Sequence, residues 1–122
     1  RLLCAAVPLL AALPGPLAAA DVPPLFQYSP QTLSEADRRA TATLYARTCA
    51  SCHGMDGGGV NNGLALYNAK VPQVSAGVIH FGAVEPVDKP IIMPAYGALS
   101  ILSPTEIGQL AEYIKSFRPP WP

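Results

Sequence analysis

The chain has 122 residues, of which half are hydrophobic and 13% are charged, and its eight basic and eight acidic side chains cancel. This length allows one small domain, and the balanced charge argues against a nucleic-acid-binding protein, which would carry a basic patch. Fourteen prolines and ten glycines predict short helices joined by long loops. Such a fold needs a covalent or metal-based crosslink to hold its loops in place.

Residues 1–20 have the pattern of an export signal. Arg1 precedes an apolar run over residues 2–13, and the alanines at 18–20 provide an A-x-A cleavage site. We therefore predict a signal peptide that is removed on export. Two alternatives stay open. A retained membrane anchor is one, although prolines interrupt the run. A lipidated Cys4 is the other, although it would need a longer apolar run before it.

The next segment divides into an arm and a helix. Residues 21–33 contain three prolines in their first ten positions and no helical period, which predicts an extended N-terminal arm. Ser34, with Asp37 three residues later, forms a weak capping box and predicts a helix over residues 35–48. The expected inner face is Ala40, Leu44 and Tyr45, and the expected outer face carries Arg38, Arg39 and Arg47.

This helix leads directly into Cys49-Ala50-Ser51-Cys52-His53. The pattern is C-x-x-C-H, the attachment signature of a c-type haem. Each thiol can bond to one vinyl group of the same porphyrin, and the neutral imidazole of His53 can then ligate the iron. A thioredoxin-like pair is the alternative, but the strand-then-helix setting of that motif is missing, and a zinc site would need further ligands nearby. We predict one covalently attached haem and no disulfide in the domain.

The region between the motif and the last helix is rich in loops. Residues 54–62 are nearly all glycine, asparagine and aspartate, which predicts a loop that wraps the haem edge. Its expected apolar anchors are Leu64, Leu66 and Tyr67. Residues 72–81 form a predicted helix, with Pro72 in its first turn and Gly82 just beyond its end. Its apolar positions at helical spacing are Val74, Val78 and Phe81. Residues 83–90 are a predicted loop.

The clearest helix start is Ser103-Pro104-Thr105-Glu106, where serine is the N-cap, proline the first helical residue and glutamate the end of a capping box. The helix is predicted to continue to Arg118-Pro119-Pro120. Its apolar face comprises Ile107, Leu110, Ala111, Ile114 and Phe117. We expect this face to pack on the helix over residues 35–48, because neither helix is long enough to be stable alone. Residues 119–122 are a Pro-rich tail.

A haem iron with one histidine ligand has a sixth position to fill. Met55 is only two residues from His53 and lies on the same side of the ring. Met93, followed by Pro94, precedes the last helix in a loop that can fold over the other face. Its soft thioether sulfur would raise the reduction potential. His80 is the alternative ligand and would give a lower potential. Otherwise, we interpret it as a surface or propionate-side residue.

Together these segments resemble a class I, monohaem cytochrome c. The matching segments are residues 49–54, Met93-Pro94-Ala95-Tyr96-Gly97 and the closing helix at 102–114. The resemblance spans most of residues 34–117. It implies an all-α, small cytochrome c fold, with three to four short helices and long loops around one covalently bound haem, over a domain at residues 34–118. It also implies thioether bonds from Cys49 and Cys52, a proximal ligand His53, a distal ligand Met93, and Tyr45 and Tyr113 where the first and last helices cross.

Two departures from the family pattern stand out. Thr41 and Ala42 occupy the helix crossing where the family often has glycine. The family also often has Gly-Pro-x-Leu after the motif, with the proline carbonyl accepting a hydrogen bond from the proximal histidine. Here the segment is Gly63-Leu64-Ala65-Leu66, so the expected acceptor is the Leu64 carbonyl, in a less rigid loop.

The resulting functional expectation is a periplasmic electron carrier that docks transiently to redox protein partners at its exposed haem edge. Membrane contact is expected only if the N-terminal segment is retained. The alternative is a haem subunit of a larger dehydrogenase or oxidase, held by residues 21–30 or 119–122. An open-site haem sensor or enzyme ranks last, because it requires that Met93 not bind. Tyr67 is a candidate hydrogen-bond donor near the methionine sulfur or a propionate, and Lys70 and Lys89 are solvated residues or partner contacts.

Overall fold

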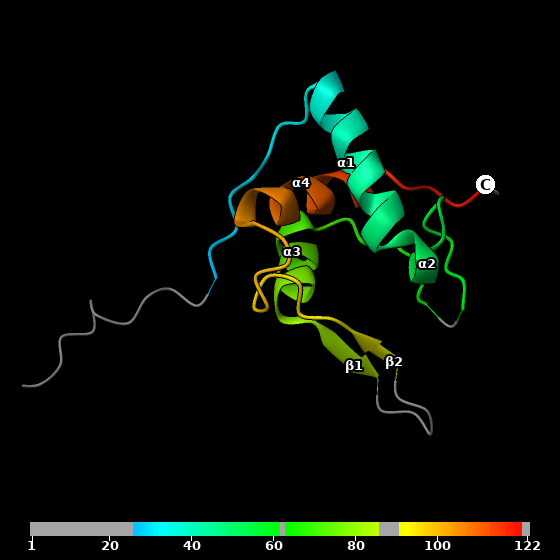
Figure 1. The fold of residues 1–122 in the computed structure, drawn as a ribbon. Helices are drawn as coiled ribbons and strands as arrows, with labels where there is room; N and C mark the ends of the chain where they lie inside the picture. Colours follow the sequence, from blue (N-terminus) through cyan, green and yellow to red (C-terminus); the bar gives the residue numbers. More distant parts are fainter. Residues whose placement is uncertain (1–25, 62, 86–90, 121–122) are drawn as a thin grey trace, which may run out of the picture.

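The computed structural model describes residues 26–61, 63–85 and 91–120 (Figure 1). The predicted signal segment, the first residues of the arm, Lys89 and the end of the tail lie outside these ranges. In chain order the elements are α1 (Glu35–Thr48), α2 (Ala50–His53), α3 (Pro72–Phe81), β1 (Ala83–Glu85), β2 (Ile91–Met93) and α4 (Pro104–Ile114). Four helices over the described residues confirm the predicted helical fold. No helix within these ranges has the length and apolar character needed to cross a membrane.

Capping boxes begin two of the helices, as the sequence predicts. At α1, the Ser34 hydroxyl accepts a hydrogen bond from the Asp37 N–H, and the Asp37 carboxylate accepts one from the Ser34 N–H, both at 3.1 Å. At α4, Ser103 and Glu106 form the equivalent pair, at 3.2 and 2.8 Å, with a proline as the first helical residue. These bonds satisfy backbone donors that the first turn of a helix leaves unpaired.

The core is built on α4, which packs against α1 on one side and α3 on the other (Figure 1). Four of the five positions of its predicted apolar face are buried on the helix, namely Ile107, Leu110, Ala111 and Ile114, and the fifth, Phe117, is half-buried beyond the helix end. On α1, Tyr45 is buried and Leu44 half-buried, but Ala40 is exposed and Thr41 takes its place in the interface. The Tyr45 and Tyr113 rings lie 5.6 Å apart at the helix crossing, as the resemblance implies.

The last helix ends earlier than predicted, at Ile114. The Ser116 hydroxyl donates to the Tyr113 carbonyl at 2.6 Å, a local bond that competes with further helical turns. Lys70 caps this end, because its ammonium donates to the carbonyls of Lys115 and Phe117 at 3.3 and 2.5 Å. A cation at this position complements the negative end of the helix dipole. Lys70 therefore ties the loop after α2 to the end of α4.

Helix α3 has the predicted bounds, with Pro72 as its first residue and Gly82 just past its end. Its buried residues are Ser75, Ala76 and Ile79. The apolar positions singled out from the sequence, Val74, Val78 and Phe81, are exposed instead. The helix is apolar on more than one face, and only one of those faces contacts α4.

The predicted loop at residues 83–90 is wrong for residues 83–85, which form β1. This strand pairs antiparallel with β2, placing Ala83 opposite Met93 and Val84 opposite Ile92. Gly82 permits the approach, since its φ is +74° and a Cβ there would lie 2.6 Å from the Met93 carbonyl oxygen. The hairpin thus holds Met93 against the end of α3.

The arm has no helix or strand over residues 26–33, as predicted, and it packs on the domain (Figure 1). The Phe26 ring lies 4.5 Å from that of His80 on α3. The Tyr28 hydroxyl donates to the Glu112 carboxylate on α4 at 2.7 Å. The arm therefore contacts two of the four helices.

Candidate functional site

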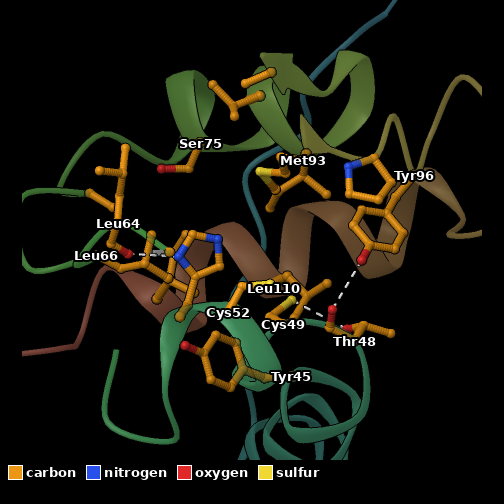
Figure 2. A pocket seen from close by; sticks show the side chains of 18 of the residues that line it. Tyr45, Thr48, Cys49, Cys52, Leu64, Leu66, Ser75, Met93, Tyr96 and Leu110 are labelled. Carbon is orange, nitrogen blue, oxygen red and sulfur yellow. Dashed lines mark hydrogen bonds between the residues drawn. The ribbon is translucent and has the colours of Figure 1, made fainter. Parts of the chain in front are cut away.

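A cavity of about 500 Å³ lies between the α1–α2 junction, the loop after α2, helix α3 and strand β2 (Figure 2). This volume is within the range of roughly 300–1,000 Å³ that is typical of cofactor pockets. The four predicted site residues, Cys49, Cys52, His53 and Met93, all line it. None of the described residues in the lining is Asp, Glu, Lys or Arg. The cavity therefore suits a largely apolar group.

The two cysteines lie at the junction of α1 and α2 and are both free thiols. Cys49 is half-buried and Cys52 is exposed. Burial raises the pKa of the Cys49 thiol, and a hydrogen bond with the Thr48 hydroxyl, at 3.2 Å between oxygen and sulfur, partly opposes this effect.

The His53 ring is oriented by a hydrogen bond to the loop after α2. Its Nδ1 lies 2.7 Å from the carbonyl oxygen of Leu64. A carbonyl oxygen only accepts hydrogen bonds, so Nδ1 carries a proton, and in the neutral imidazole the lone pair then lies on Nε2. This confirms Leu64 as the expected acceptor. A partner of this kind fixes the ring orientation and raises the basicity of the other nitrogen.

The motif is clamped between α1 and the loop that follows it. The Tyr45 hydroxyl donates to the buried carbonyl of Gly54 at 2.8 Å. On the other side, backbone N–H groups of Gly59 and Val60 donate to the carbonyls of His53 and Cys52, at 2.7 and 2.8 Å. A Cβ at Gly63 would collide with the Cys52 carbonyl, so only glycine fits there. These contacts hold the two thiols and the imidazole in one place.

Met93 lines the cavity on the side opposite the two cysteines, where β2 and α3 lie (Figure 2). The segment that follows it is tied to the motif, because the Tyr96 hydroxyl donates to the Thr48 carbonyl at 3.0 Å. The same segment is tied to α3, because the Ala98 N–H donates to the His80 carbonyl at 3.0 Å. The cavity is thus enclosed by two segments with a hydrogen bond between them.

Comparison with known families decides what this arrangement is. The family model described as "Cytochrome C oxidase, cbb3-type, subunit III" matches residues 36–114, from the second residue of α1 to the end of α4. The chain belongs to this cytochrome c family. A comparison with curated proteins found no match. Cytochromes c bind haem covalently and use it for electron transfer, and domains of this type are usually exported.

The walls of the cavity fit the haem of a cytochrome c. Four large apolar side chains that are 40–66% exposed face into it, namely Leu64, Val74, Val78 and Ile92. A porphyrin in the cavity would cover their surfaces, which is favourable because apolar area leaves water. This explains why the apolar positions of α3 exceed what its contact with α4 requires. Helical spacing alone does not separate a face that packs on protein from one that packs on a cofactor.

Three residues considered from the sequence lie outside the lining of this cytochrome c cavity. His80, the alternative ligand, packs against the Phe26 ring at a tilt and meets the Phe81 ring edge-on. Met55 is 67% exposed. Tyr67, expected near the methionine sulfur or a propionate, lies beside Gly58 instead. Tyr96, which is part of the matching segment after Met93, lines the cavity instead, and its hydroxyl points toward Thr48 (Figure 2).

Proposed function

We propose that this cytochrome c is a periplasmic carrier of one electron. One haem is bonded to Cys49 and Cys52, and its iron is ligated by His53 and Met93. The observation that supports this most strongly is the convergence of all four side chains on one cavity whose described lining is uncharged. When bound, the haem supplies reversible one-electron exchange between Fe(II) and Fe(III).

The chain's own residues contribute by holding the two ligands still. His53 is fixed through Leu64, and the Met93 segment is fixed through Tyr96 and Ala98. A coordination sphere that is held in this way would change little between oxidation states. The structural reorganisation that accompanies electron transfer would then be small, which favours fast transfer. The thioether of Met93 favours Fe(II) and raises the reduction potential.

We propose that redox proteins dock briefly at the haem edge. Cys52 and Leu64 line the cavity and are also exposed, which supports an opening to the surface on their side. Contacts of this kind are small and short-lived in electron-transfer proteins. We further propose that residues 1–20 are removed on export, that residues 34–118 are the haem domain, and that residues 119–122 are a tail.

The test uses visible spectra of the haem-loaded protein in both oxidation states, with and without carbon monoxide. The reduced parent protein should ignore carbon monoxide, and Met93→Ala should bind it, because the sixth position is then open. Met55→Ala is the matched control and should behave as the parent, since Met55 lies outside the cavity lining. A parent protein that binds carbon monoxide at once would refute the His53 and Met93 assignment and favour an open-site sensor or enzyme.

A second candidate function is that of a haem subunit in a larger oxidase. The description of the matching family, which names subunit III of an oxidase, favours it. The arm and the Pro-rich tail are then the proposed docking segments. A tagged chain purified under mild conditions should bring down large partner subunits if this candidate is correct. A monomer that exchanges electrons freely with soluble acceptors would contradict it.

A further inference from the structure

His80 is a half-buried residue that the proposed function leaves unused. It lies in the last turn of α3 and does not line the cavity. Its Nδ1 is buried and has no hydrogen-bond partner among the described residues. Burying a polar atom in this way costs free energy. Hydrogen bonding of Nδ1 therefore does not explain why the His80 ring is held at this position.

The His80 ring contacts the segment that follows Met93. Gly97 packs so closely on the imidazole that a Cβ there would collide with Nδ1, and it would also lie 2.8 Å from Ile107. The carbonyl of His80 accepts the Ala98 N–H at 3.0 Å. His80 thus contacts this segment with both its side chain and its backbone, only four to five residues from Met93.

The N-terminal arm also packs on His80. The Phe26 ring lies 4.5 Å from the imidazole, tilted by 30°, and it meets the edge of Phe81 at 6.0 Å. The Tyr28 hydroxyl, bonded to Glu112, holds the arm two residues further on. The His80 ring therefore contacts both the arm and the segment that follows Met93.

We propose that Phe26 and His80 are positioning residues for Met93. The arm holds the imidazole against Gly97, and the imidazole keeps the Met93 segment closed over the cavity. Occupancy of the sixth coordination position then depends on docking of the arm, which links the N-terminal part of the chain to the iron. This inference rests on the proposed function, because it takes Met93 to be an iron ligand.

Three variants of the full, haem-loaded chain test the proposal. His80→Ala removes the ring, Phe26→Ala removes the arm contact, and His80→Phe restores a ring without the nitrogens. Leu99→Ala is the matched control, because Leu99 lies in the same segment but is 64% exposed. Three properties are measured: carbon monoxide binding, the weak long-wavelength absorption of ferric haem with a thioether ligand, and hydrogen exchange of the Ala98 amide by NMR.

Both alanine variants should raise the population with an open sixth position roughly tenfold or more, seen as carbon monoxide binding and a weaker thioether band. Exchange of the Ala98 amide should accelerate by a similar factor, because its bond to His80 opens with the segment. His80→Phe and Leu99→Ala should match the parent. If His80→Ala does not fold, Phe26→Ala carries the test, since the Phe26 ring is only half-buried.

Each other outcome is decisive. Alanine variants that match the parent in all three properties would overturn the proposal. His80→Phe that binds carbon monoxide as readily as His80→Ala would overturn it too, because a nitrogen rather than the packed ring would then be required. If the parent itself binds carbon monoxide, the proposed function fails. Exchange of the Ala98 amide is then the one measurement that still tests this inference. Faster Ala98 exchange in Phe26→Ala would still support control of the segment by the arm, and unchanged exchange would not.

Discussion

Replacing Tyr45 with phenylalanine should destabilise the protein through a single lost hydrogen bond. Tyr45 is 1% exposed, and its hydroxyl donates to the buried Gly54 carbonyl at 2.8 Å. Burial raises the pKa of Tyr45, so the hydroxyl remains a donor through the neutral range. Phenylalanine keeps the ring contacts with Tyr113 and Phe117, at 5.6 and 5.1 Å. The variant leaves the buried Gly54 carbonyl without its donor, which should lower the free energy of unfolding by about 1–3 kcal/mol.

Urea unfolding of the haem-loaded protein, followed by far-UV circular dichroism, measures this difference. In a domain of this size, each kcal/mol corresponds to about 4–8 °C in Tm, so a thermal melt checks the same number. Tyr113→Phe is the control, because the Tyr113 hydroxyl donates no hydrogen bond within the described residues, and its effect should stay within about 0.5 kcal/mol. If Tyr45→Phe also stays within that limit, the clamp on the motif is not the bond to Gly54.

Three further predictions concern stability. Ser103→Ala should lower the free energy of unfolding by about 1 kcal/mol in urea titrations, because it removes the N-cap of α4. Gly77→Ala should raise it by up to about 1 kcal/mol, because glycine weakens α3 and the added Cβ meets nothing within 4 Å. Burial alone would raise the pKa of Glu112, but hydrogen bonds from Lys115 and Tyr28 lower it below its usual value of 4.5. The resulting stabilisation is present above the unfolded-state pKa and is lost as the pH falls through the folded-state pKa, so Glu112→Gln should flatten the acid dependence of stability below about pH 5.

Local chemistry explains which features could be predicted from the sequence. A capping box involves residues only three apart, so Ser34 and Ser103 mark the starts of α1 and α4 without knowledge of the fold. Thioether attachment and iron ligation need two cysteines and a histidine at fixed spacing, so the motif identifies the cofactor directly. The Leu64 carbonyl was predictable because the family pattern places an acceptor at that position.

The features that could not be predicted depend on contacts between distant segments. Strands of three residues are too short to show an alternation of apolar and polar side chains. The strands β1 and β2 are therefore identified only by their pairing in the structure, where Ala83 lies opposite Met93. The burial of Thr41 in place of Ala40 reflects the angle at which α1 crosses α4, which the sequence does not specify. The surroundings of His80 could not be predicted either, because Phe26 and Gly97, from distant parts of the chain, both pack on its ring.

From the distribution of apolar side chains, we expect the amount of this protein in the cell to depend on haem attachment. Eight hydrophobic residues are buried in the core of the described chain, while Leu64, Val74, Val78 and Ile92 face the cavity. A group bound only by the folded state adds its binding free energy to the stability of that state. A polypeptide that has not received haem lacks this contribution and is a better substrate for proteases, which act on opened chains. We therefore expect the pool that survives proteolysis to be enriched in haem-loaded chains.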